Sequence, residues 1–290
     1  MNRILFLIFL LSMGLHGAAQ EAAANARKER PFVLGKIEEL PSKELGEVRI
    51  LNIYLPEGYK ANDTVRYPVV YLLDGSADED FIHIAGLYQF NSFPWVDRVP
   101  KSIVVGIATV DRRRDFTYPT RNEKDRTRYP TTGKSARFIS FLEKELQPFV
   151  ETHYRCTGTR TLIGQSLGGL LATEVLLTKP ELFTHYIIVS PSLWWDNGSL
   201  LERRPALLQE NFNHPLEVYV GVGKEGVVPG DVPRVMEVDA NLLADKLRAS
   251  KSLSVHVEFD YLPDEDHGTI LHQAVANALR VFKLHSSTKH

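Results

Sequence analysis

This sequence has almost no cysteine, no excess of charge of one sign and no long hydrophobic run. Its 290 residues contain one cysteine, Cys156, so no disulfide can form within the chain. The 34 lysines and arginines nearly balance the 36 aspartates and glutamates, which leaves a net charge of −2. Binding of nucleic acid needs a basic surface that neutralises phosphates. The charge balance therefore argues against a nucleic-acid partner, and the three arginines at residues 112–114 are too few to change this.

The most apolar segment lies at the N-terminus. Residues 4–15 are almost unbroken apolar sequence, between a short basic start and a few small residues. A membrane-spanning helix needs about 20 such residues, whereas this shorter pattern is typical of a secretory signal peptide. We predict that residues 1–20 are a signal peptide cleaved near Gln20. Residues 21–290 would then form a single domain in the periplasm or outside the cell, with no stable membrane insertion.

Short β-branched runs alternate with helical patterns along the rest of the chain. The runs are bounded by Gly, Asp or Pro, as in strands buried on both faces. The strand candidates are residues 48–55, 69–73, 103–108, 161–163, 186–189, 218–222 and 255–261. The helix candidates are residues 135–151, 170–177, 241–249 and 269–282, and Pro148 should end or kink the first. Parallel strands need crossovers, usually helices, so we predict an α/β fold with a mostly parallel central sheet and helices on both faces.

The sequence GQSLG at residues 164–168 places a serine between a predicted strand and a predicted helix. In a strand-to-helix turn of this kind the central side chain is exposed above the carboxyl edge of the sheet. The turn is so tight that neighbouring backbone leaves no room for a Cβ atom at Gly164 and Gly168. A structural loop serine is the alternative, but the flanking strand and helix favour Ser166 as a nucleophile.

A serine nucleophile needs a base within hydrogen-bond reach, and histidine suits that task at neutral pH. Five histidines follow Ser166 before the C-terminal tail. His267 lies in a turn-rich loop after the last predicted strand, where its side chain can point to the carboxyl edge of the sheet. His256 lies in a strand and His272 in a helix, so we predict His267 as the base.

The third member of a triad, a carboxylate, orients the imidazole and stabilises its protonated form. It should follow the strand at residues 218–222, and Glu225 is the first carboxylate there. Asp231, Glu237 and Asp239 are the alternatives. A further possibility is that all four are solvated and that serine and histidine work as a pair.

Negative charge on the attacked carbonyl oxygen needs preorganised donors. The backbone N–H of Leu167, directly after the nucleophile, is one predicted donor. The other should come from the loop after an early strand, where Asp74, Gly75 and Ser76 follow VVYLL. We predict the N–H of Ser76, with Gly75 as a flexible hinge.

Several segments together resemble the branch of the α/β-hydrolases that contains esterase D and the siderophore esterases of the enterobactin type, related to feruloyl esterases and antigen 85. They are residues 46–56, YPVVYLLDG at 67–75, VVGIATVDRRRDFTYP at 104–119, GQSLGG at 164–169, SPSLWW at 190–195, GVGKEG at 221–226 and DHG at 266–268. The resemblance implies carboxylic-ester hydrolysis by Ser166 and His267, an acid at Glu225, and neither a metal nor an organic cofactor. Residues 227–237 lengthen the loop after Glu225, which leaves the acid open.

Three further side chains are candidates for substrate binding because they follow predicted strands at their carboxyl ends. Arg114 could bind an anionic group, and Trp194 or Trp195 could stack on a sugar or catechol ring. The alternatives are an arginine paired with a structural carboxylate and a tryptophan in the core.

We therefore predict an exported serine esterase that forms an acyl-enzyme, acting on a small-molecule or glycan ester such as an acylated carbohydrate or a siderophore. An acyltransferase with the same triad is one alternative, because an alcohol can replace water in the second step. A non-catalytic binding protein on the hydrolase fold is the other.

Overall fold

The computed structural model describes residues 29–282 except 210, 229 and 231. The predicted signal peptide at residues 1–20 lies outside the described residues, so export and the single domain from residue 21 stay predictions. In the part of the chain described, no helix has both the length and the apolar character that crossing a membrane requires.

An eight-stranded sheet forms the centre of the molecule, with the strands in the order β1-β2-β4-β3-β5-β6-β7-β10. β1 and β2 pair antiparallel, as do β2 and β4, and every other neighbouring pair is parallel. The strands are β1 (Lys36–Ser42), β2 (Glu47–Tyr54), β3 (Tyr67–Leu72), β4 (Ile103–Ile107), β5 (Cys156–Gln165), β6 (His185–Val189), β7 (Leu216–Gly223) and β10 (Val255–Leu262). A separate short pair is β8 (Val227–Val228) and β9 (Arg234–Val235).

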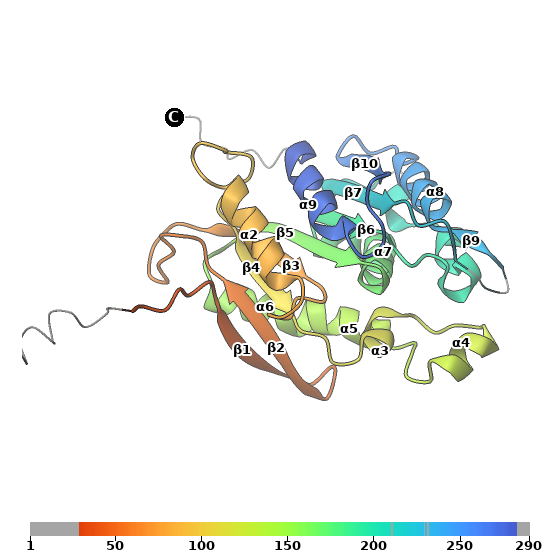
Figure 1. Ribbon diagram of the computed structural model, residues 1–290, viewed down its shortest axis with the longest axis horizontal. Helices are drawn as coiled ribbons and strands as arrows, with labels where there is room; N and C mark the ends of the chain where they lie inside the picture. The colour runs from red at the N-terminus through yellow and green to blue at the C-terminus, as the bar shows by residue number, and fades with distance from the viewer. Residues whose placement is uncertain (1–28, 210, 229, 231, 283–290) are drawn as a thin grey trace, which may run out of the picture. The chain divides into compact units, whose positions relative to one another are not determined.

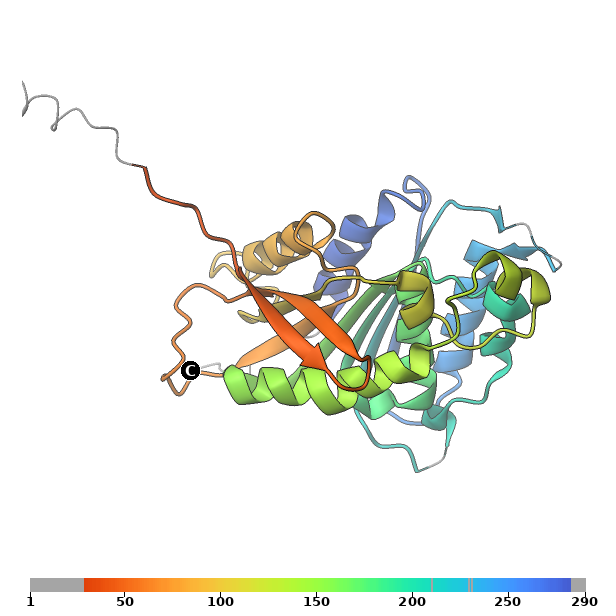
Figure 2. The same ribbon diagram turned by 90° about the horizontal axis from the view of Figure 1, so that it is seen from below.

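Helices cover both faces of the sheet. Their bounds are α2 (Phe81–Asn91), α3 (Arg112–Phe116), α4 (Glu123–Arg128), α5 (Ser135–Phe141), α6 (Gln147–His153), α7 (Leu167–Thr178), α8 (Met236–Arg248) and α9 (Ile270–Val281). α2 and α9 pack together on one face, as Figure 1 shows. In Figure 2 the green α5 and α6 lie on the opposite side of the sheet from the orange α2 and the blue α9. The predicted α/β architecture is confirmed.

Central strands are buried on both faces, which explains their continuous apolar sequence. Tyr71 and Leu162 belong to the core beneath α5–α8, whereas their neighbours Leu72 and Ile163 point to the opposite face, and all four are at most 1% exposed. Alternate side chains of a strand point to opposite faces. Both layers of helices therefore bury apolar area against the same few strands, which fixes the position of the strand ends.

The helix that begins at Ser135 continues past Pro148, where the sequence predicts either an end or a kink. A π-helical turn at Leu142–Leu146 joins α5 to α6, which continues to His153. A proline ring normally clashes with the carbonyl four residues earlier. The wider turn directly before Pro148 makes room for the ring, so the helix continues.

The carboxyl ends of β3, β5, β6, β7 and β10 meet at one edge of the sheet, because these strands are parallel neighbours. Ligands of α/β proteins bind at this edge. Most of the site residues predicted from the sequence follow these strands, so the topology brings their loops together.

Candidate active site

Ser166 lies in the turn between β5 and α7, and its backbone has the unusual dihedrals φ 57° and ψ −117°. A non-glycine residue in this region is strained, and such strain concentrates at functional sites. The turn is tight, because a Cβ added to Gly164 would lie 2.3 Å from the carbonyl oxygen of Gly168. The prediction that residue 164 must be glycine is therefore confirmed, because any side chain there would clash with the backbone of Gly168.

The hydroxyl of Ser166 begins a chain of two hydrogen bonds that joins three loops. Its Oγ lies 2.9 Å from Nε2 of His267, and Nδ1 of His267 lies 2.5 Å from Oε2 of Glu225. Ionised Glu225 only accepts hydrogen bonds, so Nδ1 carries the proton. Nε2 is then the acceptor of the Ser166 proton, which is the arrangement that a general base requires.

Glu225 is held on its second oxygen as well. The hydroxyl of Ser190 donates to Oε1, and the N–H of Gly223 approaches the same atom at 3.3 Å. The Glu225 side chain is 5% exposed, whereas that of His267 is 47% exposed. Burial raises the pKa of Glu225, but the bonds from His267 and Ser190 outweigh it, and the net pKa lies below the ordinary value. Glu225 is therefore ionised at neutral pH.

The loop that carries His267 is held to the neighbouring loops by hydrogen bonds to its backbone carbonyls. The side-chain amide of Gln165, next to the nucleophile, donates to the carbonyl of His267 at 2.5 Å. The N–H of Lys224 donates to the carbonyl of Glu265 at 2.8 Å. These bonds tie the imidazole loop to the loops of both its partners.

The alternative acids lie elsewhere in the structure or outside it. Glu237 accepts hydrogen bonds from the backbone N–H groups of Glu225 and Gly226, at 2.9 and 3.0 Å, so it braces the loop that carries Glu225. Asp239 forms a bidentate pair with Arg234. Asp231 is outside the described residues. Among these candidates, the described structure places Glu225 against His267.

The loop after β3 packs against the first turn of α7. A Cβ on Gly168 would lie 3.3 Å from Oδ2 of Asp74, a buried residue with a φ of 53°. The space at Gly168 is therefore limited by side chains and not, as predicted, by neighbouring backbone. Arg112 donates to both oxygens of Asp74 and also to the backbone carbonyl of Gln165 at 3.0 Å. This bridge fixes the loop that contains Gly75 and Ser76 beside the nucleophile, and it was not foreseen from the sequence.

A pocket with a cavity of about 550 Å³ opens at Ser166 and His267. Trp194, Val228 and Met236 supply apolar walls, and Lys224 and Asp266 supply charges. The strands end at this pocket and the hydroxyl of Ser166 lines it. The arrangement can bind a partly apolar substrate and present its carbonyl group to the serine.

Of the two adjacent tryptophans, only Trp194 lines this pocket in the described structure. Trp195 is 1% exposed, and its indole N–H donates to the carbonyl of Tyr118 at 2.9 Å. Trp195 therefore occupies the core, which was the alternative considered for one of the pair.

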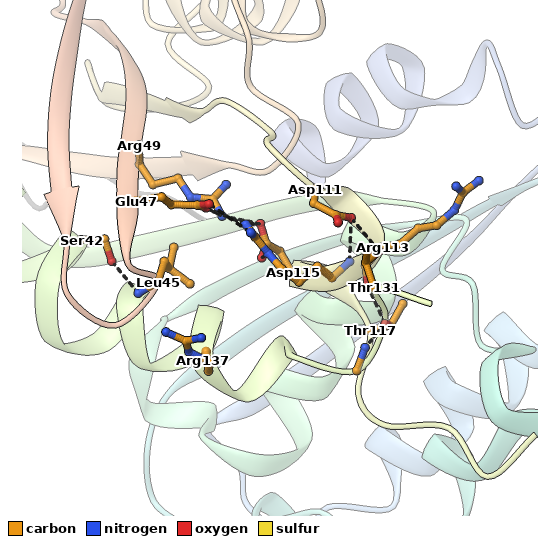
Figure 3. Close-up of polar contacts among 12 residues, drawn as sticks. Ser42, Leu45, Glu47, Arg49, Asp111, Arg113, Asp115, Thr117, Thr131 and Arg137 are labelled. Carbon is orange, nitrogen blue, oxygen red and sulfur yellow. Dashed lines mark hydrogen bonds and ion pairs between the residues drawn. The ribbon is translucent and has the colours of Figure 1, made fainter. Parts of the chain in front are cut away.

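Arg114 belongs to a cluster of charged residues that we call the arginine cluster, comprising Glu47, Arg49, Arg114 and Asp115. Arg114 donates to Glu47 at 2.6 and 3.0 Å and to Asp115 at 2.7 and 3.1 Å. Figure 3 shows Glu47 and Arg49 of β2 pointing toward Asp115 of α3. The bonds to Asp115 and Glu47 raise the pKa of Arg114, so its charge is permanent. Its donors are occupied by carboxylates, which favours the structural alternative over binding of an anionic substrate.

Nothing in the described residues groups three or more His, Cys, Asp or Glu side chains as a metal site would. The sequence reasoning also missed two hydroxyls at the site. Ser190 contacts Glu225, and Oγ of Ser192 lies 3.3 Å from Oγ of Ser166. Both belong to the SPSLWW segment, in which the sequence predicts only the tryptophans as site residues.

Residues 42–268 match the protein-family model described as "Putative esterase". The ferri-bacillibactin esterase BesA of Bacillus subtilis is 29% identical over 281 residues, which cover 92% of this chain and 96% of BesA. An IroE-like serine hydrolase from Shewanella oneidensis superposes with a TM-score of 0.73 and 34% identity over 85% of this chain and 79% of its own. The BES protein from Bacillus cereus superposes with a TM-score of 0.72 and is 28% identical. The match covers 88% of this chain and 97% of the BES protein.

Proposed function

The chain belongs to the esterase family of α/β-hydrolases, and on that premise we propose that it hydrolyses carboxylic esters through a triad of Ser166, His267 and Glu225. The observation that carries the proposal is the continuous chain of hydrogen bonds from Ser166 to Glu225, at 2.9 and 2.5 Å, on the wall of a pocket. The strained backbone of Ser166 is a second support.

In this mechanism Ser166 Oγ attacks the ester carbonyl carbon while His267 Nε2 takes the hydroxyl proton. The imidazolium is stabilised by Glu225 and gives the proton to the leaving alcohol, which leaves an acyl group on Ser166. Water then attacks, His267 again acts as base and acid, and the carboxylic acid departs.

The oxyanion formed in each step would be bound by the N–H groups of Leu167 and Ser76. Leu167 is the first residue of α7, so its N–H also lies at the positive end of a helix. Gly75 is ruled out as the second donor, because its N–H donates to the carbonyl of Ile107 at 3.0 Å. The second oxyanion donor from this loop is therefore the backbone N–H of the next residue, Ser76.

For the substrate we propose a carboxylic ester with an aromatic or apolar acyl portion, such as an ester siderophore or an arylated carbohydrate. Trp194 and Met236 provide the apolar wall, and Lys224 can attract an anionic or strongly polar group. The name of BesA as a ferri-bacillibactin esterase supports a siderophore ester. We also propose that the chain is exported after cleavage near Gln20, on the pattern of residues 1–20.

The test is hydrolysis of p-nitrophenyl esters by purified protein, compared with the Ser166→Ala variant. We expect at least about a 10³-fold loss of kcat/KM in the variant. We also expect a fluorophosphonate probe to label the wild type and not the variant. If the wild type neither hydrolyses the esters nor reacts with the probe, the esterase proposal is wrong and the chain is a non-catalytic binding protein on the same fold.

A further inference from the structure

We propose that the turn Ser190-Pro191-Ser192, which we call the serine turn, positions both ends of the triad at once. The inference rests on the proposed function of Ser166, His267 and Glu225. The turn follows β6, between the strands that carry the nucleophile and the acid. The sequence assigns neither serine a role, although their segment, SPSLWW, is one of those that carry the family resemblance.

At the acid end, Ser190 binds Glu225 on the oxygen that His267 does not use. Ser190 is fully buried, and its own N–H donates to the carbonyl of Gly221 at 2.7 Å. Its φ of 42° is in the region that favours glycine. The strained backbone and the buried hydroxyl together aim one donor at the Glu225 carboxylate, which leaves the other oxygen facing the imidazole.

At the nucleophile end, three hydrogen bonds join the serine turn and β6 to Ser166. The N–H of Ser166 donates to the carbonyl of Val189 at 3.0 Å, and the N–H of Ser192 donates to the carbonyl of Ser166 at 3.0 Å. The third joins the two hydroxyls at 3.3 Å. Since the proton of Ser166 goes to His267, the hydroxyl of Ser192 must be the donor in this pair.

Close backbone packing fixes the turn between these ends. A Cβ added to Gly169 would lie 2.9 Å from the carbonyl oxygen of Val189 and 3.0 Å from Cα of Pro191. The proline also fixes its own φ. Gly169, the third glycine of GQSLGG, therefore allows α7 to approach the serine turn. This role is separate from that of Gly164, which makes room within the turn between β5 and α7.

The chemical consequence differs between the two serines. The Ser192 hydroxyl holds Ser166 Oγ toward His267 before attack. In the second step the bond between the acyl carbon and Oγ breaks, the electron pair returns to Oγ, and His267 supplies the proton. A donor already aimed at Oγ stabilises that developing charge. Ser190 acts through Glu225 and is a positioning residue.

The experiment compares Ser192→Ala, Ser190→Ala and Ser190→Gly with the wild type and with Ser102→Ala. Ser102 is also a buried serine, but its hydroxyl donates to the carbonyl of Pro100, at the amino end of β4. For each variant we measure kcat, KM and the pH profile on p-nitrophenyl acetate, the labelling rate with a fluorophosphonate, and the melting temperature. We expect kcat to fall about tenfold for each serine-turn variant and to stay unchanged for Ser102→Ala.

Two readouts separate positioning from a structural role. Ser190→Gly relieves the strained φ that Ser190→Ala retains, so the two should differ in melting temperature and share the same loss of kcat. Loss of the Ser190 bond raises the pKa of Glu225. The activity that depends on ionised Glu225 should therefore be lost at a higher pH in both Ser190 variants than in the wild type, and not in Ser192→Ala.

The inference is overturned if the wild type is active, Ser166→Ala is inactive and the three serine-turn variants keep the wild-type kcat. It is also overturned if their losses appear only in KM or follow the melting temperature. A wild type that is inert to both the ester and the probe overturns the proposed function, and this inference with it.

Discussion

The arginine cluster and the triad both join carboxylates to nitrogen donors at the ends of strands, yet they differ in what they leave open. In the arginine cluster the side chains of Arg49 and Asp115 are 1% and 2% exposed. Each carboxylate there accepts from guanidinium groups of the same cluster (Figure 3). In the triad, Glu225 is equally buried, but His267 is 47% exposed and Ser166 lines a pocket.

Backbone strain marks the same difference. Ser166, Ser190 and Asp74, at or beside the proposed active site, all have positive φ. No member of the arginine cluster is among the residues with positive φ in the described part of the chain. In a structural cluster it suffices that the charges pair with one another, whereas a reactive site also needs a side chain that a substrate can reach and a backbone that holds it in place.

The strongest test of the contrast between the two regions is to replace one carboxylate by its amide in each. In Glu225→Gln we expect kcat/KM for p-nitrophenyl acetate to fall about 10³–10⁴-fold. An amide that turns its NH₂ toward Nδ1 favours the tautomer with the proton on Nε2, which cannot accept from Ser166. Unfolding in urea should change little. A loss of less than about tenfold would indicate that Ser166 and His267 work as a pair without an acid.

The matched change in the arginine cluster is Asp115→Asn, and it should act on stability. Arg49 would stay buried and keep Glu47 but lose Asp115, the more buried of its two charged partners. Breaking a buried ion pair typically costs about 3 kcal/mol of unfolding free energy, and the remaining pair with Glu47 should reduce that cost. Urea unfolding measures this, and kcat/KM of the folded protein should stay within about twofold of the wild type. If Asp115→Asn instead raised KM for anionic esters alone and left stability unchanged, Arg114 would be a substrate-binding residue.

The central strands could be predicted because each is buried on both faces, so its sequence is continuously apolar. β1 was missed for the opposite reason: its residues KIEELPS are largely polar, and it pairs only with β2 at the sheet edge. α2 was missed because FIHIAGLYQFN is apolar nearly all round and shows no clear stripe.

The proposed nucleophile and base could be located from the sequence because each follows a strand and carries a reactive side chain, whereas the acid stayed open among four carboxylates. The direction in which each side chain points could not be predicted from its place in the sequence. Trp194 and Trp195 are adjacent, yet one lines the pocket and the other fills the core. The contacts of Ser190 and Ser192 depend on which strand ends are neighbours, and a single sequence does not contain that information directly.

A smaller effect should follow from closing the gap beside the serine turn. In Gly169→Ala the new Cβ would press on Val189 and Pro191, and we expect a loss of about 1–3 kcal/mol in stability with a severalfold fall in kcat. Gly158→Ala is the control, because nothing lies within 4 Å of a Cβ added there. Equal kcat in both variants would show that the packing of the turn has no bearing on the reaction.

The smallest expected effect is the pH dependence of stability, and it is shared by the two regions. Burial raises the pKa of Glu225 and of Glu47, but hydrogen bonds from His267 and Ser190 in one case and from Arg114 in the other bring both below the ordinary value of 4.5. The folded protein therefore holds each ionised form better than the unfolded chain does.

The contribution of each carboxylate should be complete above pH 4.5 and disappear as the pH falls through the folded pKa. Urea unfolding of the wild type, Glu225→Gln and Glu47→Gln across this range should give stability differences that shrink toward acid pH. At neutral pH only Glu225→Gln should lose activity. A difference for Glu225→Gln that grows toward acid would mean that the folded protein stabilises protonated Glu225, and an acid of that kind could not hold His267 in the tautomer that accepts the Ser166 proton.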